Sequence, residues 1–579
     1  MKSFTKISIL FTLLFFSYFD TLTGQENNFF KAAGSPLNPK IKQAWNVYLD
    51  YKGVTDLCKT IANTFPNLVT LESIGKTYEN RDLWVLTITD NSIGNFMEKP
   101  GFYIDGNIHS NEVQGCMVSL YTAWYLVENF GKNEFITNLL KKKTFYILPN
   151  INPDGSENYM KSPNSMHSPR SGVLPIDDDG DGLFDEDLYD DLDNDGNICY
   201  MRRKNPMGKF KIDPHLPNYM VQVPFDQFGD YEYLGEEGID NDGDGLVNED
   251  RIGIYDPNRD WGWGWQPEYI QNGTYRYPFS LPETQAIRDF VISHPNIAGA
   301  QTYHNFGGMI LRSPGNASDN AAYTGADVQV FDALAAKGEI MLPGYKYMVI
   351  HKDLYTLYGG ENDWFYGARG IFIFCNELFS SSFYYNKPNN MWSNPEEQLK
   401  FDRDFLFNDM LVPWKEFNHP IYGKIEIGGF KKNYTRNNPG FMLESDAHRN
   451  MAFTLYHASQ MPDLQIQTPE VIDLGDGLKQ VTVSIVNNAI IPTHSGQDVN
   501  KKIELSDLVI IENAKVIAGM IVVNKDLNLC TEQKQNPQSI KVQNISGMSA
   551  IHVRWIIESN SNFNIVVKSK KGGVVSLKK

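Results

Sequence analysis

The chain is poor in cysteine and in long apolar segments for its length. Its five cysteines are scattered through 579 residues, and an odd count leaves at least one of them unpaired. This distribution excludes a disulfide scaffold. The apolar run at residues 7–19 is too short to span a membrane comfortably. We therefore expect no integral membrane segment.

Positive charge is also scarce relative to negative charge. The sequence has 52 Lys and Arg against 70 Asp and Glu, for a formal net charge of -18. An acidic chain is a poor partner for nucleic acid or an anionic membrane, so we expect neither. Much of the acidity lies in two Asp-rich clusters, at 177–195 and 236–250, which are more typical of cation sites than of a solvated face.

The N-terminus has the pattern of a secretory signal. Lys2 and Lys6 precede the apolar run, and small residues follow it as far as Gly24. The pattern predicts a cleaved signal peptide at 1–24. The mature protein is then expected to be secreted, periplasmic or at the cell surface.

Between residues 40 and 425, apolar strand-like runs alternate with amphipathic helical patterns. The helical patterns lie at 113–130 and 281–293. The strands are predicted at 83–88, 102–104, 145–148, 297–302 and 371–374. This alternation predicts an α/β domain whose parallel or mixed sheet is covered by helices on both faces. Ligands bind beyond the carboxyl ends of the strands in such sheets.

The pattern changes after residue 425. A connecting segment is predicted at 426–461, with a helix near 441–460. From 462 to 579, short alternating runs separated by turn residues predict an Ig-like β-sandwich. No cluster of chemically active residues occurs in this last segment.

An acidic insertion at 160–250 contains an internal repeat, 176–187 and 239–250. Counted from Asp177 and from Asp240, each copy has acidic residues at positions 1, 3 and 5 and glycine at position 6. This pattern predicts a structural calcium site. The bidentate Glu of an EF-hand is missing, and a disordered acidic loop is the alternative. The candidate calcium ligands are Asp177, Asp179, Asp181 and Asp185 in the first copy, and Asp240, Asp242, Asp244 and Asn248 in the second.

The most informative motif is His109-Ser110-Asn111-Glu112, directly after a predicted strand. A His-x-x-acid spacing arises about once by chance in a chain of this composition, so the pair alone is weak. A catalytic zinc site needs a third protein ligand and an open position for water. His304 ends a later predicted strand and can supply that ligand.

Further polar motifs follow in order along the chain. They are Asn-Pro-Asp-Gly at 152–155, Arg-Arg-Lys at 202–204, Asp-Pro-Asn-Arg at 256–259, Tyr with Gly-Gly and Asp-Trp across 355–364, and Glu-Leu at 377–378. Together with the two histidines and an early segment at 74–81, these motifs resemble the zinc carboxypeptidases of the carboxypeptidase A type. The resemblance covers roughly 50–380 and implies an eight-stranded mixed sheet flanked by helices.

The resemblance also implies a role for each motif. His109, Glu112 and His304 would bind one catalytic Zn²⁺. Asp256 would accept the second N–H of a ligating imidazole. Glu377 would be the general base, and Arg203 would stabilise the oxyanion, although Arg202 could exchange roles with it. The residues expected to contact substrate are Asn258 and Arg259, which would hold its terminal carboxylate, Tyr355, which would close over it, and Asn362.

Two positions depart from the family pattern. Asn111 replaces an arginine that many digestive members carry inside the His-x-x-Glu motif. Asn362 stands at the floor of the side-chain pocket, where members have an aliphatic or an acidic residue. A neutral amide supplies neither an apolar floor nor a charge, so the preferred C-terminal residue stays open.

The favoured hypothesis is an exported zinc metallocarboxypeptidase that hydrolyses C-terminal amino acids from peptides or proteins with a free C-terminus. A relative that acts on cell-wall peptides or modified tails is an alternative. A calcium-stabilised binding protein on a degenerate peptidase fold is a third, although no expected ligand or base is missing.

Overall fold

The structure is a computed structural model. It describes residues 33–36, 38–162, 169–177, 180–214, 216–250, 252–379, 395–432, 436–559 and 562–578. The predicted signal peptide and Asp179 lie outside these residues. Residues 41–579 form one compact unit, whose fold is described below.

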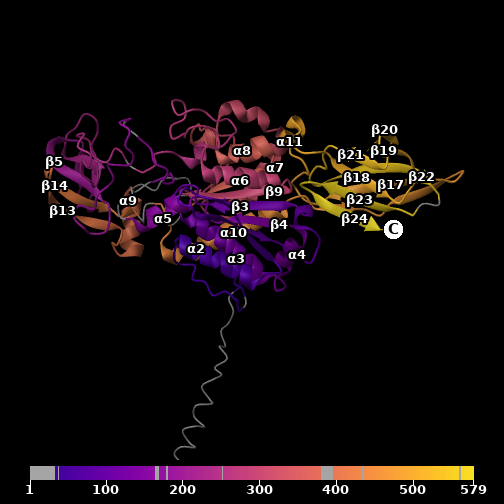
Figure 1. Ribbon diagram of the computed structural model, residues 1–579, viewed down its shortest axis with the longest axis horizontal. Helices are drawn as coiled ribbons and strands as arrows, with labels where there is room; N and C mark the ends of the chain where they lie inside the picture. Colours follow the sequence, from indigo (N-terminus) through magenta and orange to yellow (C-terminus); the bar gives the residue numbers. More distant parts are fainter. Residues whose placement is uncertain are drawn as a thin grey trace, which may run out of the picture. The chain divides into compact units, whose positions relative to one another are not determined.

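The centre of this unit is an eight-stranded mixed sheet (Figure 1). Its order is β1 (Val69–Lys76), β2 (Asp82–Ile88), β4 (Thr144–Leu148), β3 (Gly101–Gly106), β9 (Ile297–Asn305), β12 (Phe372–Leu378), β10 (Met309–Arg312) and β11 (Lys346–Val349). The neighbours β4, β3, β9 and β12 run parallel to one another. Strands buried on both faces read as continuous apolar runs, which is why the sequence predicts these four.

Helices cover both faces of this sheet. They are α2 (Tyr51–Thr64), α3 (Gln114–Asn129), α4 (Glu134–Lys142), α5 (Pro153–Lys161), α6 (Pro282–Ser293), α7 (Gly325–Met341), α8 (Glu361–Arg369) and α10 (Gly440–Ser459). In Figure 1, α2, α3 and α10 lie on one side of the sheet, and α6 and α8 lie on the other. The α/β fold predicted from the sequence is confirmed.

Helix α10 belongs to the α/β domain of the central sheet, which differs from the connecting segment predicted at 426–461. It packs against α3 and β9. Its side chains Phe453, Leu455 and Ala458 are buried in the main hydrophobic cluster together with residues of the central sheet. The helical pattern alone does not reveal which surface a helix covers, so the sequence separated it from the domain that it completes.

A second, six-stranded sheet occupies much of the predicted insertion. Its order is β13 (Leu411–His419), β14 (Gly423–Phe430), β5 (Tyr200–Gly208), β8 (Gly229–Glu236), β6 (Phe210–Asp213) and β7 (Leu216–Gln222). Strands β13 and β14 come from a segment placed outside the insertion by the sequence. Strand β14 pairs with β5, and β13 pairs with β14. The insertion is therefore a folded unit rather than an acidic loop alone.

The C-terminal region consists of two antiparallel sheets. One contains β15 (Leu464–Ile466), β16 (Glu470–Gly475), β17 (Leu478–Asn487), β19 (Val516–Asn524), β20 (Leu529–Glu532) and β22 (Ser549–Glu558). The other contains β18 (Asp507–Glu512), β21 (Ser539–Val542), β23 (Asn564–Ser569) and β24 (Gly573–Lys578). The apolar faces of both contribute to one hydrophobic cluster, as a sandwich requires.

This C-terminal region forms hydrogen bonds with the last turn of α8. Gln497 Nε2 donates to the carbonyl of Gly367 at 2.7 Å. Lys571 Nζ donates to the carbonyl of Arg369 at 2.7 Å and to Asp498 Oδ2 at 3.0 Å. Lys571 and Asp498 are 3% and 1% exposed, so this is a buried charge pair.

The remaining expectations about the chain concern its thiols and its membrane spans. All five cysteines lie within the described residues and carry free thiols. Among the described residues, no helix combines the length and apolar character needed to cross a bilayer.

Candidate metal centre and active site

The carboxyl ends of three neighbouring strands bring the predicted site residues together. His109 follows the end of β3, His304 lies near the end of β9, and Glu377 lies near the end of β12. His304 and Glu377 face each other in register across the β9–β12 pair. Because parallel strands end at the same edge, residues far apart in the sequence meet there.

The Asn-Pro-Asp-Gly motif braces the loop that carries the first histidine. Asn152 caps α5 and its Nδ2 donates to the carbonyl of Ile108 at 3.1 Å. Asp154 accepts hydrogen bonds from Thr77 Oγ1 at 2.7 Å and from the N–H of Glu79 at 2.8 Å. The motif is therefore structural, and it connects the early family-like segment to the site.

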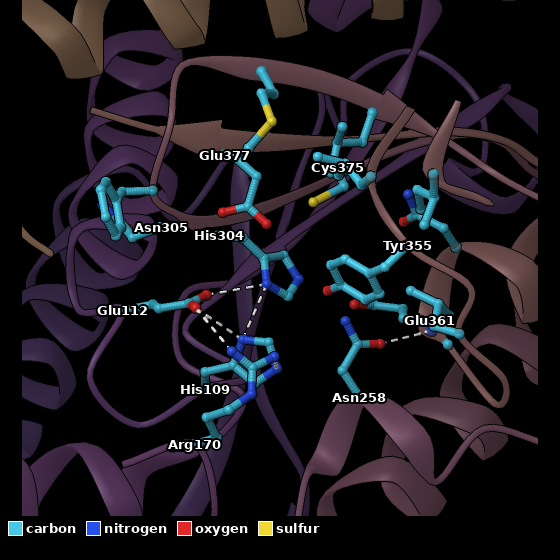
Figure 2. A pocket seen from close by; sticks show the side chains of 18 of the residues that line it. His109, Glu112, Arg170, Asn258, His304, Asn305, Tyr355, Glu361, Cys375 and Glu377 are labelled. Carbon is cyan, nitrogen blue, oxygen red and sulfur yellow. Dashed lines mark hydrogen bonds and ion pairs between the residues drawn. The ribbon is translucent and has the colours of Figure 1, made fainter. Parts of the chain in front are cut away.

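His109, Glu112 and His304 converge on one point (Figure 2). The Nδ1 atoms of the two histidines lie 3.2 Å apart, and they lie 2.9 and 3.0 Å from the two carboxylate oxygens of Glu112. All three residues are at least 97% buried. Burial alone would raise the pKa of Glu112, but the two histidines hold it well below its usual range.

This donor set fits a catalytic zinc ion. Two imidazole nitrogens and one carboxylate are a known ligand combination for zinc, with one position left for water or substrate. Glu112 Oε2 is buried and accepts no hydrogen bond within the described residues, as expected for an atom whose partner is a cation. Burying that oxygen without any partner would be costly.

Asp256 lies against the second ring nitrogen of His109, where the sequence places it. Its Oδ1 lies 3.0 Å from His109 Nε2, and its Oδ2 accepts from Arg170 Nε at 2.9 Å. When Nε2 carries the ring proton and donates it to Asp256, Nδ1 is free to bind metal. Burial would raise the pKa of Asp256, but Arg170, Arg259 and His109 hold it well below its usual value.

The arginine beside the metal ligands is Arg170, not Arg203. Arg170 lines the cavity, and its Nη1 lies 3.9 Å from Glu112 Oε1. Arg203 lies on β5 in the six-stranded sheet, where its Nη2 pairs with Glu232 at 2.9 Å. Arg202 is on the same strand and pairs with Glu426 at 2.6 Å. Neither residue lines the cavity, which places both away from the metal ligands.

A signal for Arg170 was present in the sequence. It is the only arginine between His109 and the first acidic repeat at Asp177. The Arg-Arg-Lys motif is more conspicuous, but it follows the repeat and belongs to the inserted sheet. A second arginine that the sequence did not indicate, Arg436, also lines the cavity, with its Nη1 3.6 Å from Glu112 Oε1.

Glu377 stands beside the metal ligands without belonging to their set. It lies near His304 and Cys375, with one donor atom of each residue within 4.8 Å of the others. Burial raises the pKa of Glu377 to about 7, and the neighbouring Glu112 adds to this rise. A carboxyl group with a pKa near neutrality can accept and return a proton at physiological pH.

The predicted substrate-contacting residues line the same cavity, whose volume is about 230 Å³. Arg259 is buried, and its Nη1 donates to the carbonyl of Asn258 at 2.6 Å. Tyr355 lines the cavity and is 51% exposed. Figure 2 shows Tyr355 and Asn258 on the opposite side of His304 from Glu112.

Helix α8 contributes the floor of the cavity through Glu361 and Asn362. The Glu361 N–H donates to Asn258 Oδ1 at 2.8 Å, and its carboxyl accepts from Thr302 Oγ1 at 3.2 Å. Burial raises the pKa of Glu361 well above its usual value, and Asp105 raises it further. Glu361 was not singled out from the sequence, because it precedes the residue that the family pattern marks.

The acidic repeats are only partly assembled as cation sites. In the second copy, carboxylate oxygens of Asp240, Asp242 and Asp244 lie within 4.8 Å of one another. The predicted ligand Asn248 binds a different group: its Nδ2 donates to the carbonyl of Glu236 at 3.0 Å.

In the first copy, the carboxylate of Asp177 accepts from the N–H of Gly182 at 3.1 Å. The carboxylate of Asp181 accepts from the N–H of Leu183 at 2.7 Å, while Asp185 has a buried Oδ1 without a hydrogen-bond partner among the described residues.

Comparison with known proteins agrees with this geometry. The model of the zinc carboxypeptidase family matches residues 54–400, more than half of the chain. The chain belongs to the zinc carboxypeptidase family. The resemblance inferred from the motifs is therefore confirmed. A second model, a domain of unknown function (DUF8731), matches residues 463–578.

Individual relatives match shorter stretches. Carboxypeptidase D of Mus musculus is 38% identical over 99 residues, which cover 17% of this chain and 7% of that protein. A zinc carboxypeptidase of Saccharothrix mutabilis subsp. capreolus is 36% identical over 104 residues, or 18% of this chain and 24% of the relative. The chain thus spans only a small part of these relatives.

Among solved structures, the carboxypeptidase A of Helicoverpa armigera matches with a TM-score of 0.43 and 18% identity. The match covers 73% of this chain and 76% of that one.

Proposed function

We propose that the protein is an exported zinc metallocarboxypeptidase that removes the C-terminal residue from peptides. The observation that carries this proposal is that one cavity is lined by a His₂Glu metal set, a carboxyl group with a pKa near neutrality, and a buried arginine beyond them. A hydrolase for internal peptide bonds has no terminal carboxylate to bind and so does not need a buried cation such as Arg259 in its cavity.

The terminal carboxylate of the peptide binds Arg259 and Asn258. The planar guanidinium of Arg259 forms paired hydrogen bonds with a carboxylate, and the Asn258 side chain adds a donor beside it. This contact places the last peptide bond next to the metal set. Tyr355 then covers the bound residue and excludes water from it.

Glu377 takes a proton from the attacking water and returns it to the amine that leaves. The new bond joins the water oxygen to the carbonyl carbon, and the bond that breaks is the last C–N bond. Zinc bound at the three donors would supply a Lewis acid that polarises the carbonyl and acidifies water. Arg170 lies beside the metal set and stabilises the negative charge that develops on the carbonyl oxygen.

Paired peptides test this proposal. A blocked peptide with a free C-terminal carboxylate and the same peptide with a C-terminal amide are incubated with the zinc-loaded protein. We expect release of the last amino acid from the free acid alone, and its loss after chelation. Equal cleavage of the amide would contradict the role of Arg259 and the exopeptidase assignment.

We also propose that the second acidic repeat binds calcium. The cluster of Asp240, Asp242 and Asp244 supports this, because hard oxygen ligands around a glycine turn suit Ca²⁺. Calcium should raise the melting temperature of the wild-type protein, and Asp242→Asn should weaken that response. A melting temperature that does not change with calcium would remove the site.

Export is proposed from the signal-like N-terminus. Expression of the full chain in a related secreting host, followed by fractionation and N-terminal sequencing, tests it. We expect the mature chain outside the cytoplasm, beginning near residue 25.

A further inference from the structure

Past the carboxylate-binding residues, the cavity has a wall of apolar side chains next to polar residues of α8. Met309, Leu311, Ile350, Leu357 and Cys375 form a small buried hydrophobic cluster, and all five line the cavity. A peptide whose carboxylate is held beside this wall must turn its last side chain toward it. The wall therefore determines which C-terminal residue fits.

One of these polar residues is Asn362, in the first turn of α8. It lines the cavity and is 6% exposed. Neither its Oδ1 nor its Nδ2 has a hydrogen-bond partner among the described residues. Buried polar groups are almost always paired, and a carboxamide left with both ends free in an apolar wall is unusual. The missing partner should present one donor and one acceptor.

A cationic side chain does not meet this requirement. Lysine and arginine tips only donate hydrogen bonds, so such a tip could pair with Asn362 Oδ1 but would leave Nδ2 without an acceptor. The acidic neighbours of Asn362 in α8 do not change this. Asp363 accepts from the N–H of Gly315 at 2.9 Å, and Glu361 accepts from Thr302 Oγ1 at 3.2 Å. A cationic tip that paired with either carboxyl group would still leave Asn362 Nδ2 unpaired.

Anionic and purely apolar side chains fit no better. The cations that line the cavity are Arg170, Arg259 and Arg436, which lie at the metal set or at the carboxylate-binding position. A second carboxylate in the apolar wall would have no partner. An aliphatic side chain would fill the wall but would leave both atoms of Asn362 desolvated and unpaired.

We propose that this cavity selects peptides ending in glutamine or asparagine, through reciprocal hydrogen bonds between the substrate carboxamide and Asn362. A carboxamide offers one donor group and one acceptor, which complements the Asn362 side chain, while its methylene stem packs on the apolar wall. This inference rests on the proposed function and adds the substrate class to it.

A matched substrate series tests the inference. Blocked dipeptides that differ only in the last residue, with Gln, Asn, Leu, Phe, Lys and Glu, are compared by kcat/KM with the zinc-loaded protein. We expect Gln or Asn to exceed Leu and Lys by at least about tenfold, since a site built to hydrogen-bond a substrate discriminates against analogues that lack the group.

Two variants separate this interaction from general packing. Asn362→Leu should lower the Gln rate and raise the Leu rate, which inverts the preference. Asn362→Asp should shift the preference toward Lys. An unchanged order in both variants, or a wild-type enzyme that favours Leu, Phe or Lys, overturns the inference while the carboxypeptidase proposal stands.

Binding gives a readout that does not depend on turnover. The affinities of the same dipeptides for zinc-loaded Glu377→Gln protein are measured by calorimetry. We expect the Gln and Asn peptides to bind most tightly. If none of the series is hydrolysed by the wild type, the proposed function fails. If the Gln and Asn peptides also bind no more tightly than Leu, the selection of a carboxamide fails independently.

Discussion

Removing the Asp256 carboxylate should weaken metal binding without removing a metal ligand. In the structure, Asp256 Oδ1 lies 3.0 Å from His109 Nε2, and both groups are buried. Asp256→Ala removes the acceptor that keeps the proton on Nε2 and leaves Nδ1 free for the metal. It also leaves Arg170 without its 2.9 Å partner beside the cation site.

The expected loss is a factor of about 10–100 in zinc affinity, the usual effect of removing such a partner of a ligating histidine. This corresponds to about 1.4–2.8 kcal/mol. A competition titration against a chromophoric chelator measures it directly. The matched control is Glu232→Ala, which removes the carboxylate of the Arg203 pair in the inserted sheet and should leave zinc affinity unchanged.

Two results would refute this reasoning. One is unaltered zinc affinity in a folded Asp256→Ala protein, which would mean that the tautomer of His109 is fixed by another group. The other is an equal loss in the Glu232→Ala control, which would mean that the change reports general destabilisation.

Three further predictions concern the base, the arginines and the domain contact. Glu377→Gln should lower kcat by about 10²–10⁴-fold with zinc affinity retained. In the wild type, kcat/KM should fall as the pH drops through the pKa of Glu377, because protonation removes the base. That pKa is about 7 without metal, and a bound cation lowers it. Arg170→Met should lower kcat about 10²–10³-fold, whereas the kcat of Arg203→Met should stay within about threefold of the wild-type value. A larger loss in Arg203→Met than in Arg170→Met would assign oxyanion stabilisation to Arg203. Lys571→Met should lower the free energy of unfolding by about 1–3 kcal/mol, measured by denaturant titration. The change removes the charged donor of buried Asp498 and of the Arg369 carbonyl, while His494 Nδ1 stays 3.2 Å from Asp498. An unchanged free energy of unfolding would show that the pair contributes little.

The sequence indicated the central sheet because its strands are buried on both faces. Such strands are continuous apolar runs, as at 102–104 and 145–148, and they stand out from any surroundings. The strands of the inserted sheet did not stand out, because β5 mixes arginines with apolar residues and has one face exposed. The sequence therefore predicts a calcium-binding acidic insertion at 160–250 but no sheet within it.

The meeting of His109, Glu112, His304 and Glu377 in one cavity could be predicted, because each follows or ends a recognisable strand in a fixed order. The arginine beside them could not be predicted in this way, since Arg170 belongs to a loop with no regular pattern. Its position depends on pairing with Asp256, which lies 86 residues further along the chain. Contacts of this kind depend on the folded geometry, and a linear motif search favours the denser cluster at 202–204.

Helix α8 is nine residues long, which corresponds to about 13 Å. Its first turn forms the cavity floor, its last turn is held by Lys571, and the chain continues through Gly370 into the strand that bears Glu377. Because the helix is this short, we expect a shift of the C-terminal region to move the cavity floor and Glu377 together. The C-terminal region therefore cannot be exchanged freely: a replacement domain would have to reproduce the hydrogen bond to the Arg369 carbonyl. Proteolytic removal of this region should lower activity although it removes none of the residues that line the cavity.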